Sequence, residues 1–515
     1  GTWVSKLKGN QDGTIFNYRV QVNGANNEAV DPYVRATTVN GLRGVIVDLS
    51  TTNPNGWNKS RPKFSGKPTD AFIYELHVRD LSMDASSGFP AAQKGKYVAF
   101  TNTNTAFAGQ KTGISAIKDL GVTHVELLPI FDFATVDENN PTFNWGYDPQ
   151  NYNVPEGSYS TDPTNPKLRI KELKSAILAL HKQGLRVNMD AVYNHVSNAS
   201  TFSQNLIVPN YFFRRDDNGN LTNGSGCGND VASERPMVRK FIVDSVRYWA
   251  NEYNMDGFRF DLMGLMDIRT INEITAALKK IDPTILVIGE GWTMGTLPAN
   301  QKANQLNIQK LMGVSHFNDQ IRDGIKGSVF DSTDTGFATG KFGARNDVMS
   351  GIVGNVDYST TINSKWTTAY PGQSVSYVES HDNMTLADKI KASVKDAKTT
   401  DIAQLSQFSA SIAFLSQGLP FMQAGQEFLR SKNGDPNSYK SSDAINSIKW
   451  NTRKSNMSSV DYYKGLIALR KSYSAFRMTT TAQVKSNLKF SDSPEGTIVY
   501  TLNGAAVKDK AATIV

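Results

Sequence analysis

A short apolar run near the middle of the chain, MDGFRFD, ends in two charges separated by one residue, Arg259 and Asp261. If the run forms a strand, residues two apart project from the same face, so the guanidinium and the carboxylate reach one rim together. A guanidinium beside a carboxylate lowers the pKa of the carboxyl group and keeps it ionised, as a nucleophile requires. An isolated Arg-x-Asp pair is usually a simple ion pair. The evidence for a functional site is therefore that the same arrangement recurs along the chain.

The same arrangement recurs where other apolar runs end. The further motifs are DAVYNH from Asp190 to His195, VIGEGW around Glu290, and VESHDN around Asp382. A carboxylate at the end of a strand can also cap a helix, and for any one of these residues the two interpretations are equally good. Capping does not explain why Arg259, His195 and His381 would reach the same rim. We therefore predict one cluster.

The elements that must position this cluster alternate along the chain from Asp70 onward. The candidate strands are AFIYEL, VTHVELL, LRVNMD, GFRFD, ILVIGE, GVSHFND, SVSYVES and LPFMQAG. Between several of them lie helical patterns, such as LRIKELKSAILALHKQG, in which apolar residues recur at spacings of three and four. Strands alternating with helices predict a parallel sheet, and a count of eight predicts a closed (β/α)8 TIM barrel. The barrel would gather the charged strand ends at its carboxyl rim.

Several carboxylates with arginine and histidine, and no metal cage, suit glycoside hydrolysis. One carboxylate must be ionised to attack the anomeric carbon, and another must keep its proton for the leaving oxygen. Asp261 beside Arg259 fits the first role. Glu290, after an apolar run and before Trp292, fits the second, because burial would raise its pKa. Asp382 would orient sugar hydroxyls.

No cofactor is needed for this chemistry, and the metal question concerns structure only. The segment DDNGN at 216–220 has oxygen ligands of the kind calcium prefers but lacks the spaced glutamate of a calcium loop, so we predict a plain turn. A structural calcium ion elsewhere in the barrel stays an open alternative.

Composition excludes other classes of protein. The 55 Lys and Arg are scattered among 48 Asp and Glu, so the net charge of +7 does not predict nucleic-acid binding. The single cysteine, Cys227, rules out an intrachain disulfide and a cysteine-based zinc cluster. No apolar run approaches the ~20 residues that span a bilayer. The chain starts without a leader, so localisation stays unknown, although scarce cysteine and abundant Ser, Thr and Asn favour a secreted or cell-surface bacterial protein.

The motifs resemble, in order, the four sequence regions of the α-amylase superfamily. The segment FNWGYDP, from Phe143 to Pro149, is similar to the signature of type I pullulanases, in which the first residue is usually Tyr. Further similar segments are GQEFLRSKNGDPNSY, INSIKW and LIALRKSYSAFRM, so the resemblance extends from about Phe72 to Met478. Met384 and Ala387 stand where His and Trp are common, so contacts outside the scissile bond are expected to differ.

The resemblance implies a role for each matching residue. Asp261 would be the nucleophile, Glu290 the acid/base and Asp382 the stabiliser of the transition state. The substrate-binding residues would be Tyr147, Asp190, His195, Arg259, Trp292 and His381. Retention of configuration predicts carboxyl groups about 5 Å apart at Asp261 and Glu290.

The implied reaction is retaining, endo-acting hydrolysis of α-1,6-glucosidic linkages. The expected substrates are pullulan, amylopectin and limit dextrins, and the expected protein is a monomer with no nucleic-acid or membrane partner. One alternative is an isoamylase or neopullulanase-like α-glucan hydrolase of the same fold, against which FNWGYDP argues. The other is a glycan-binding protein without turnover, which would need a broken set of carboxylates.

The resemblance also guides the division into domains. Residues 1–62, with the alternating run TIFNYRVQV, are interpreted as the C-terminal part of an N-terminal β-sandwich, a starch-binding-like module, with a linker. Residues 63–475 would be the catalytic barrel, with a short insertion at about 196–234. Residues 476–515, including TTTAQVKSNLKFSDSPEGTIVYTLNG, alternate like short strands and would start a C-terminal β domain. We expect these small flanking β modules to be truncated, since the family carries longer ones.

Overall fold

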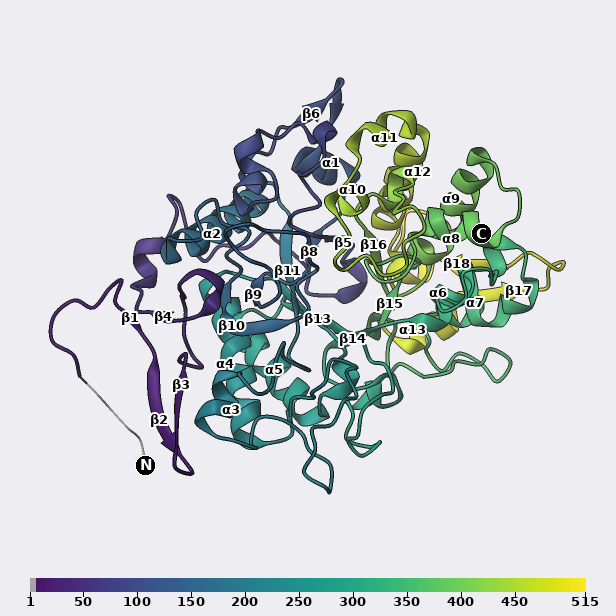
Figure 1. Cartoon of the computed structure of the whole chain (residues 1–515). Helices are drawn as coiled ribbons and strands as arrows, with labels where there is room; N and C mark the ends of the chain where they lie inside the picture. The colour runs from purple at the N-terminus through teal and green to yellow at the C-terminus, as the bar shows by residue number, and fades with distance from the viewer. Residues whose placement is uncertain (1–5) are drawn as a thin grey trace.

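A closed barrel of parallel strands forms the centre of the protein, which is described for residues 6–515 by a computed structural model (Figure 1). The barrel strands are β5 (Ile73–Leu76), β8 (His124–Leu127), β11 (Arg186–Ala191), β12 (Gly257–Phe260), β13 (Leu286–Gly289), β14 (Val314–Phe317), β15 (Ser374–Ser376) and β16 (Leu419–Gln423). Each pairs with the next in chain order, and β16 pairs with β5 to close the ring. All eight predicted strands are present, and the predicted fold class is confirmed.

The inside of the barrel has an apolar part and a polar part. Ile73, Leu286 and Leu419, each the first residue of its strand, belong to one buried apolar cluster. Residues two positions further on, such as Glu75 on β5, point to the same side of the strand. On β12, Arg259 lies two positions after Gly257, the first residue of the strand. Its side chain is therefore also directed inward. The polar groups buried inside the barrel therefore lie toward the carboxyl ends of its strands.

Helices flank the barrel as the sequence pattern predicts (Figure 1). They include α1 (Gly113–Leu120), α2 (Pro166–Lys182), α4 (Pro236–Glu252), α5 (Ile268–Ile281), α6 (Asp319–Lys326), α9 (Thr399–Leu415) and α12 (Met457–Ser472). The others are α3 (Ser203–Ile207), α7 (Arg345–Ile352), α8 (Leu386–Ser393), α10 (Asp443–Asn446), α11 (Trp450–Ser455) and α13 (Thr481–Asn487). Among residues 6–515, no helix has both the length and the apolar character that crossing a membrane requires.

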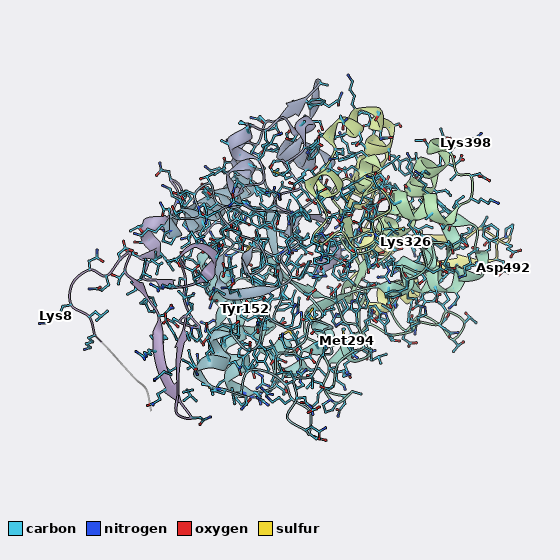
Figure 2. All side chains as sticks on the ribbon, in the orientation of Figure 1. Lys8, Tyr152, Met294, Lys326, Lys398 and Asp492 are labelled. Atoms are coloured by element: carbon cyan, nitrogen blue, oxygen red, sulfur yellow. The ribbon has the colours of Figure 1, made fainter. Side chains whose placement is uncertain are left out.

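Antiparallel pairs lie before, within and after the barrel. They involve β1 (Ile15–Phe16) with β4 (Gly44–Val45), β2 (Tyr18–Val22) with β3 (Ala25–Ala29), β6 (Ala106–Phe107) with β7 (Gln110–Lys111), and β9 (Phe131–Phe133) with β10 (Pro149–Pro155). A three-stranded sheet of β17 (Leu488–Ser491), β18 (Val499–Asn503) and β19 (Thr513–Ile514) follows α13. Lys8 and Asp492, near the two flanks, lie at opposite ends of the molecule (Figure 2).

Strands are therefore present at both ends, but one part of the expectation for residues 476–515 is wrong. Thr481–Asn487 forms the helix α13 instead of a strand. The Thr480 hydroxyl accepts the N–H of Gln483 at 3.1 Å, and the Gln483 side chain accepts the N–H of Thr480 at 3.3 Å. This reciprocal cap satisfies two amide groups at the first turn and favours a helix over the alternating pattern. The division into three domains stays a prediction.

The expectation for 216–220 agrees with the structure. Asp216 Oδ1 accepts the N–H groups of Asn218 at 3.0 Å and Asn220 at 2.8 Å. A side chain that closes its own turn in this way forms a compact surface loop. The segment is therefore a plain turn, as predicted.

Candidate active site

One cavity of about 450 Å³ lies at the carboxyl ends of the barrel strands. It is lined by Thr135, Asn144, Trp145, Tyr147, Asp148, His195, Val196, Ser197, Cys227, Asp261, Leu262, Glu290, His381, Asp382, Asn437 and Tyr439. Asp261 directly follows β12, Glu290 directly follows β13, and Asp382 lies in the segment between β15 and α8. The three carboxylates named from the sequence therefore share a single pocket, although up to 121 residues separate them along the chain.

Arg259 joins the carboxylates beneath the cavity. Its Nη1 lies 3.2 Å from Asp261 Oδ1, and its Nη2 lies 2.9 Å from Glu290 Oε1. The same Nη1 also reaches both oxygens of Asp190, at 2.9 and 2.8 Å. The guanidinium side chain is 3% exposed, so little water screens these contacts. One buried cation thus orients three carboxylates, as the Arg-x-Asp spacing predicted for the first of them.

Asp261 is held from its other side by Asn194. The Nδ2 of Asn194 donates to Asp261 Oδ2 at 2.7 Å and to the Asp261 carbonyl at 2.9 Å. With Arg259 on Oδ1 and Asn194 on Oδ2, both carboxylate oxygens have a donor. These contacts fix the orientation of the carboxylate, which a nucleophile needs for attack on one carbon atom.

Glu290 has a different environment. Burial raises the pKa of Glu290 to about 7, and the neighbouring charges of Asp261 and Asp382 act in the same direction against Arg259. Its Oε2 accepts the N–H of Leu262 at 3.0 Å, which fixes the carboxyl group across from Asp261. Two carboxylates with unlike environments are the arrangement in which one attacks and the other donates a proton. The direction expected for Glu290 from the sequence is thus found.

Tyr147, Asp190 and His195 form one connected group at the edge of the cavity. The Tyr147 hydroxyl donates to Asp190 Oδ2 at 2.5 Å, and His195 Nε2 lies 2.7 Å from the Tyr147 carbonyl. His195 Nδ1 lies 2.6 Å from Asn194 Oδ1, which links this group to Asp261. Tyr147 and His195 line the cavity, whereas Asp190 lies behind Tyr147.

His381 and Asp382 lie beside this group and also line the cavity. The imidazole of His381 stacks on Tyr147, with ring centroids 5.1 Å apart and planes 16° from parallel. Its Nε2 lies 3.8 Å from Asp382 Oδ1. The side chain of Asp382 is 47% exposed, so this carboxylate is the one a ligand can reach most directly from solvent.

Trp292, like the predicted substrate-binding residues Asp190 and Arg259, does not line the cavity. Its half-buried ring packs on the apolar cluster inside the barrel, and the Arg322 guanidinium lies 5.8 Å from the ring centroid. Trp145 and Tyr439, which we did not predict, line the cavity instead and lie edge to face at 6.3 Å. A sugar contact by Trp292 stays a prediction.

Comparison with known proteins places this site in a family. Residues 98–224 match the family described as α-amylase, catalytic domain. The chain is 42% identical to a pullulanase of Bacillus subtilis (strain 168) over 506 residues, which is 98% of this chain and 69% of that protein. The chain belongs to the pullulanase family. It is therefore a glycoside hydrolase.

Solved pullulanase structures agree with this assignment. The apo pullulanase of Paenibacillus barengoltzii superimposes with a TM-score of 0.95 at 47% identity, covering 97% of this chain and 77% of that one. The same pullulanase in complex with maltohexaose and α-cyclodextrin gives a TM-score of 0.94 at 46% identity, covering 97% and 78%. Between about a fifth and a third of each of these pullulanases has no counterpart in the present chain.

Sequence reasoning missed several residues of this pullulanase site. Asn194 lies inside the quoted motif DAVYNH, but asparagine is common in turns and nothing in its type indicated a contact with Asp261. Glu75 ends the first strand candidate just as the other acidic residues end theirs, and that signal was overlooked. Trp145, Cys227, Asn437 and Tyr439 come from loops, whose paths the strand pattern does not predict.

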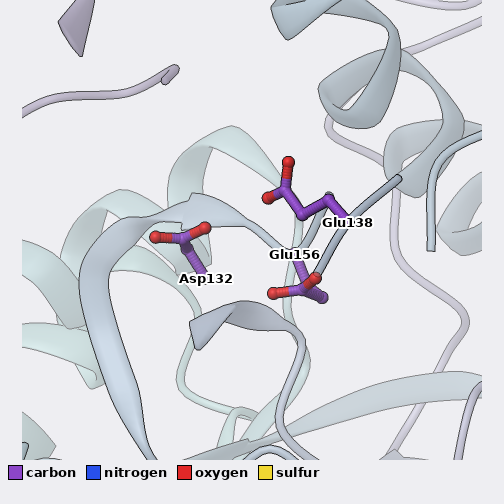
Figure 3. A group of neighbouring side chains, drawn as sticks. All are labelled: Asp132, Glu138 and Glu156. Atoms are coloured by element: carbon purple, nitrogen blue, oxygen red, sulfur yellow. The ribbon is translucent and has the colours of Figure 1, made fainter. Parts of the chain in front are cut away.

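A separate acidic group lies away from this pullulanase site, made of Asp132, Glu138 and Glu156 (Figure 3). Their oxygens already have protein donors. Arg169 donates to both oxygens of Glu138 at 2.8 and 2.7 Å, Asn151 donates to Asp132 at 2.6 Å, and the N–H of Ser158 donates to Glu156 at 2.7 Å. With a buried guanidinium in contact, the group does not fit a cation site.

Proposed function

We propose that this pullulanase is a retaining, endo-acting debranching hydrolase that cleaves α-1,6-glucosidic linkages in pullulan, amylopectin and limit dextrins. The observation that carries the proposal is the cavity in which Asp261, Glu290 and Asp382 meet, with Arg259 between the first two. A retaining glycosidase requires two carboxyl groups at one sugar, a nucleophile and an acid/base, and this cavity brings such a pair together with a third carboxylate.

In the first step, Asp261 attacks the anomeric carbon of the glucose whose bond is broken. The contacts from Arg259 and Asn194 hold its carboxylate in a fixed orientation. As the bond from Asp261 oxygen to carbon forms, the bond to the O6 oxygen of the neighbouring glucose breaks. Glu290 gives its proton to that oxygen, and a covalent glycosyl-enzyme results.

In the second step, Glu290 acts in reverse. Its carboxylate takes a proton from water, the hydroxide oxygen attacks the same carbon, and the bond to Asp261 breaks with its electrons returning to the carboxylate. Two inversions give overall retention. A pKa of about 7 suits both tasks, because the group is partly protonated and partly ionised near neutral pH.

The remaining residues bind and orient the ring. We assign Asp382 to the ring hydroxyls and to the positive charge of the transition state, and His381 to a hydroxyl group as a hydrogen-bond donor. Both ring nitrogens of His195 already contact protein oxygens, so we assign His195 to holding Asn194 and Tyr147 in place. Tyr147 offers its face as a platform for the pyranose. Asp190 and Arg259 hold Tyr147 and the carboxylates from beneath, and Trp292 would contact only sugars bound outside the cavity.

The substrate class is supported by the relatives. The pullulanase of Paenibacillus barengoltzii has been solved in complex with maltohexaose and α-cyclodextrin, which are α-glucans. The segment from Phe143 to Pro149 favours α-1,6 cleavage over an isoamylase or neopullulanase-like preference, and a complete set of carboxylates disfavours a glycan-binding protein without turnover.

Digestion of pullulan with product analysis tests the proposal. Maltotriose as the only product is the expected result. Panose or shorter α-1,4 fragments would reassign the linkage preference, and no products would leave a binding protein.

Three further parts of the proposal concern cofactors, cellular location and oligomeric state. The two steps use side chains only, so we assign no cofactor; a structural calcium ion would have to lie elsewhere than at the acidic group of Figure 3. A branched polysaccharide is too large to diffuse through a membrane, so we infer a secreted or cell-surface enzyme, to be tested by fractionating cells and medium. We expect a monomer, to be tested by light scattering.

A further inference from the structure

Glu75 lies at the carboxyl end of β5, and none of the roles above uses it. Its Oε1 lies 2.6 Å from Nδ1 of His381, 306 residues further along the chain. Both side chains are buried, at 3% exposure for Glu75 and 4% for His381. A charged pair in hydrogen-bond contact away from water is much stronger than the same pair at the surface.

We propose that Glu75 is a positioning residue that holds His381 as a cation, with its Nε2–H directed at the substrate cavity. The inference rests on the proposed function, because His381 is taken to donate to a sugar hydroxyl. It adds a residue that touches no substrate and acts only through His381.

The geometry leaves His381 one free donor. Since Nδ1 is committed to Glu75, only Nε2 can serve the cavity, where Asp382 Oδ1 lies 3.8 Å away. The ring cannot turn easily, because Tyr147 stacks on one face and the edge of Trp145 lies against it with centroids 4.7 Å apart. Glu75 therefore sets both the orientation of the ring and the direction of the remaining N–H.

The charges around His381 favour the cation. The groups that face it are Glu75 from β5, Asp382 from its own segment, Asp190 from β11, Arg259 from β12, Tyr147 from the loop before β10, and Lys432, whose Nζ donates to the His381 carbonyl at 3.3 Å. Burial lowers the pKa of His381, but Glu75 and then Asp382 outweigh burial and raise it to about 9. At neutral pH the Nε2–H is thus a charged donor.

The chain offers a matched control in Glu126. It lies directly across from Glu75 on the paired strand β8 and is just as buried, yet it makes no hydrogen bond with His381. Burial, together with Asp190 and Glu75, raises the pKa of Glu126 well above its ordinary value. Glu126→Gln therefore removes a carboxyl group from the same region while leaving the contact between Glu75 and His381 in place.

The experiment compares wild type, Glu75→Gln and Glu126→Gln. Histidine titration by NMR, with the His381 signal identified through His381→Gln, is expected to give a midpoint near pH 9 in wild type and in Glu126→Gln. In Glu75→Gln the midpoint should fall by more than about one unit. On pullulan, the ratio of kcat/KM in Glu75→Gln to that in wild type should fall as pH rises through the midpoint of the variant. It should reach a loss of roughly tenfold, the difference between a charged and a neutral donor, where His381 is neutral in the variant and still charged in wild type.

Several outcomes would overturn the inference. These are a His381 midpoint in wild type at or below the ordinary 6.5, an unmoved midpoint in Glu75→Gln, or equal losses of kcat/KM in Glu75→Gln and Glu126→Gln. If Glu75→Gln does not fold, the titration of His381 in wild type still tests the inference. The titration needs no substrate, so failure of the proposed reaction, seen as no maltotriose from wild type, is distinguishable from failure of this inference.

Discussion

Asn194 and Asp261 are joined by two hydrogen bonds from a single amide nitrogen, one to the side-chain oxygen Oδ2 at 2.7 Å and one to the backbone carbonyl at 2.9 Å. The amide therefore ties the carboxylate of Asp261 to its own backbone. Asn194 is 1% exposed, so water does not compete for these bonds. The direction of the proposed nucleophile is set by this pair together with Arg259.

Replacing Asn194 with Ala should impair chemistry more than binding. A hydrogen bond to a charged group contributes about 1.5–3 kcal/mol, so kcat should fall roughly 10- to 100-fold, with a smaller change in KM. Steady-state kinetics on pullulan measures both constants. Asn229→Ala is the control, because Asn229 bonds only to the backbone of Val196 in the same region. Equal losses of kcat in the two variants would show that Asn194 acts only through local folding.

Asp261→Asn should abolish turnover while sugar binding survives. The amide retains the size of the carboxylate and can still contact Arg259 or Asn194, but it cannot form the covalent intermediate. Calorimetry with maltotriose should give a Kd within about tenfold of wild type, because one neutral contact replaces one charged contact. An active Asp261→Asn variant, free of wild-type contamination, would refute the assignment of the nucleophile.

The raised pKa of Glu290 predicts how kcat/KM depends on pH. Its raised pKa, about 7, means that the acid form declines as pH rises through 7, so kcat/KM should fall on the basic side with a midpoint near that value. The pH–rate profile on pullulan measures it. A substrate whose leaving group needs no proton, such as a maltosyl fluoride, should be cleaved by Glu290→Ala without this basic limb. A limb that persists in Glu290→Ala would belong to another group.

The same shift has a consequence for stability. The folded-state pKa of Glu290 lies above the unfolded value of 4.5, so its favourable contribution is complete below pH 4.5 and is lost as pH rises through about 7. Glu290→Gln should therefore be more stable than wild type at pH 8 and lose that advantage at pH 5. Thermal unfolding at the two pH values tests the sign.

The sequence predicted the barrel because fully buried parallel strands are continuous apolar runs, and each of the eight runs forms a strand. It predicted where Asp261 and Glu290 lie because both directly follow such runs. It did not predict Trp145, Cys227 or Tyr439 at the cavity, since these come from loops whose paths depend on tertiary contacts. The hydrogen bond from the N–H of Trp145 to the Tyr439 carbonyl joins residues 294 positions apart and leaves no local pattern.

One mistake has an identifiable cause. The helix α13 was predicted as a strand because alternation was weighed above the T-x-x-Q signal of Thr480 and Gln483, which the structure uses as a capping box. Trp292 was assigned to substrate because aromatic residues next to a catalytic acid often stack on sugars. Its ring packs against the apolar cluster inside the barrel, and a sugar contact by its exposed part stays a prediction.

Arg169 is expected to be essential for stability because of the acidic group in Figure 3. The Arg169 side chain is fully buried against Glu138 and lies 3.9 Å from Asp132. Arg169→Met leaves these carboxylates without a cation, which costs about 3–5 kcal/mol for a buried pair. Urea unfolding should show the loss, and it should be larger at pH 8 than at pH 5. Burial raises the pKa of Glu156 to about 7, so the group gains charge in that interval. A loss of stability independent of pH would contradict this explanation.

Glycine is required at position 257, the start of β12, because the neighbouring strand lies very close to it. A Cβ built there would lie 2.2 Å from Asn188 Oδ1, on the strand residue with which Gly257 is paired. Gly257→Ala must therefore displace β11 or β12 and should lower the free energy of unfolding by about 2 kcal/mol or more.

Gly465 in α12 is the control, because a Cβ there meets nothing within 4 Å. Gly465→Ala should stabilise the protein by about 0.5–1 kcal/mol, as expected for glycine in the middle of a helix. Urea titration of both variants gives opposite signs if strand contact governs the first and helix propensity the second. A neutral Gly257→Ala would mean that the two strands can separate without cost, and kcat of that variant would then report whether Arg259, two residues further along β12, has kept its place.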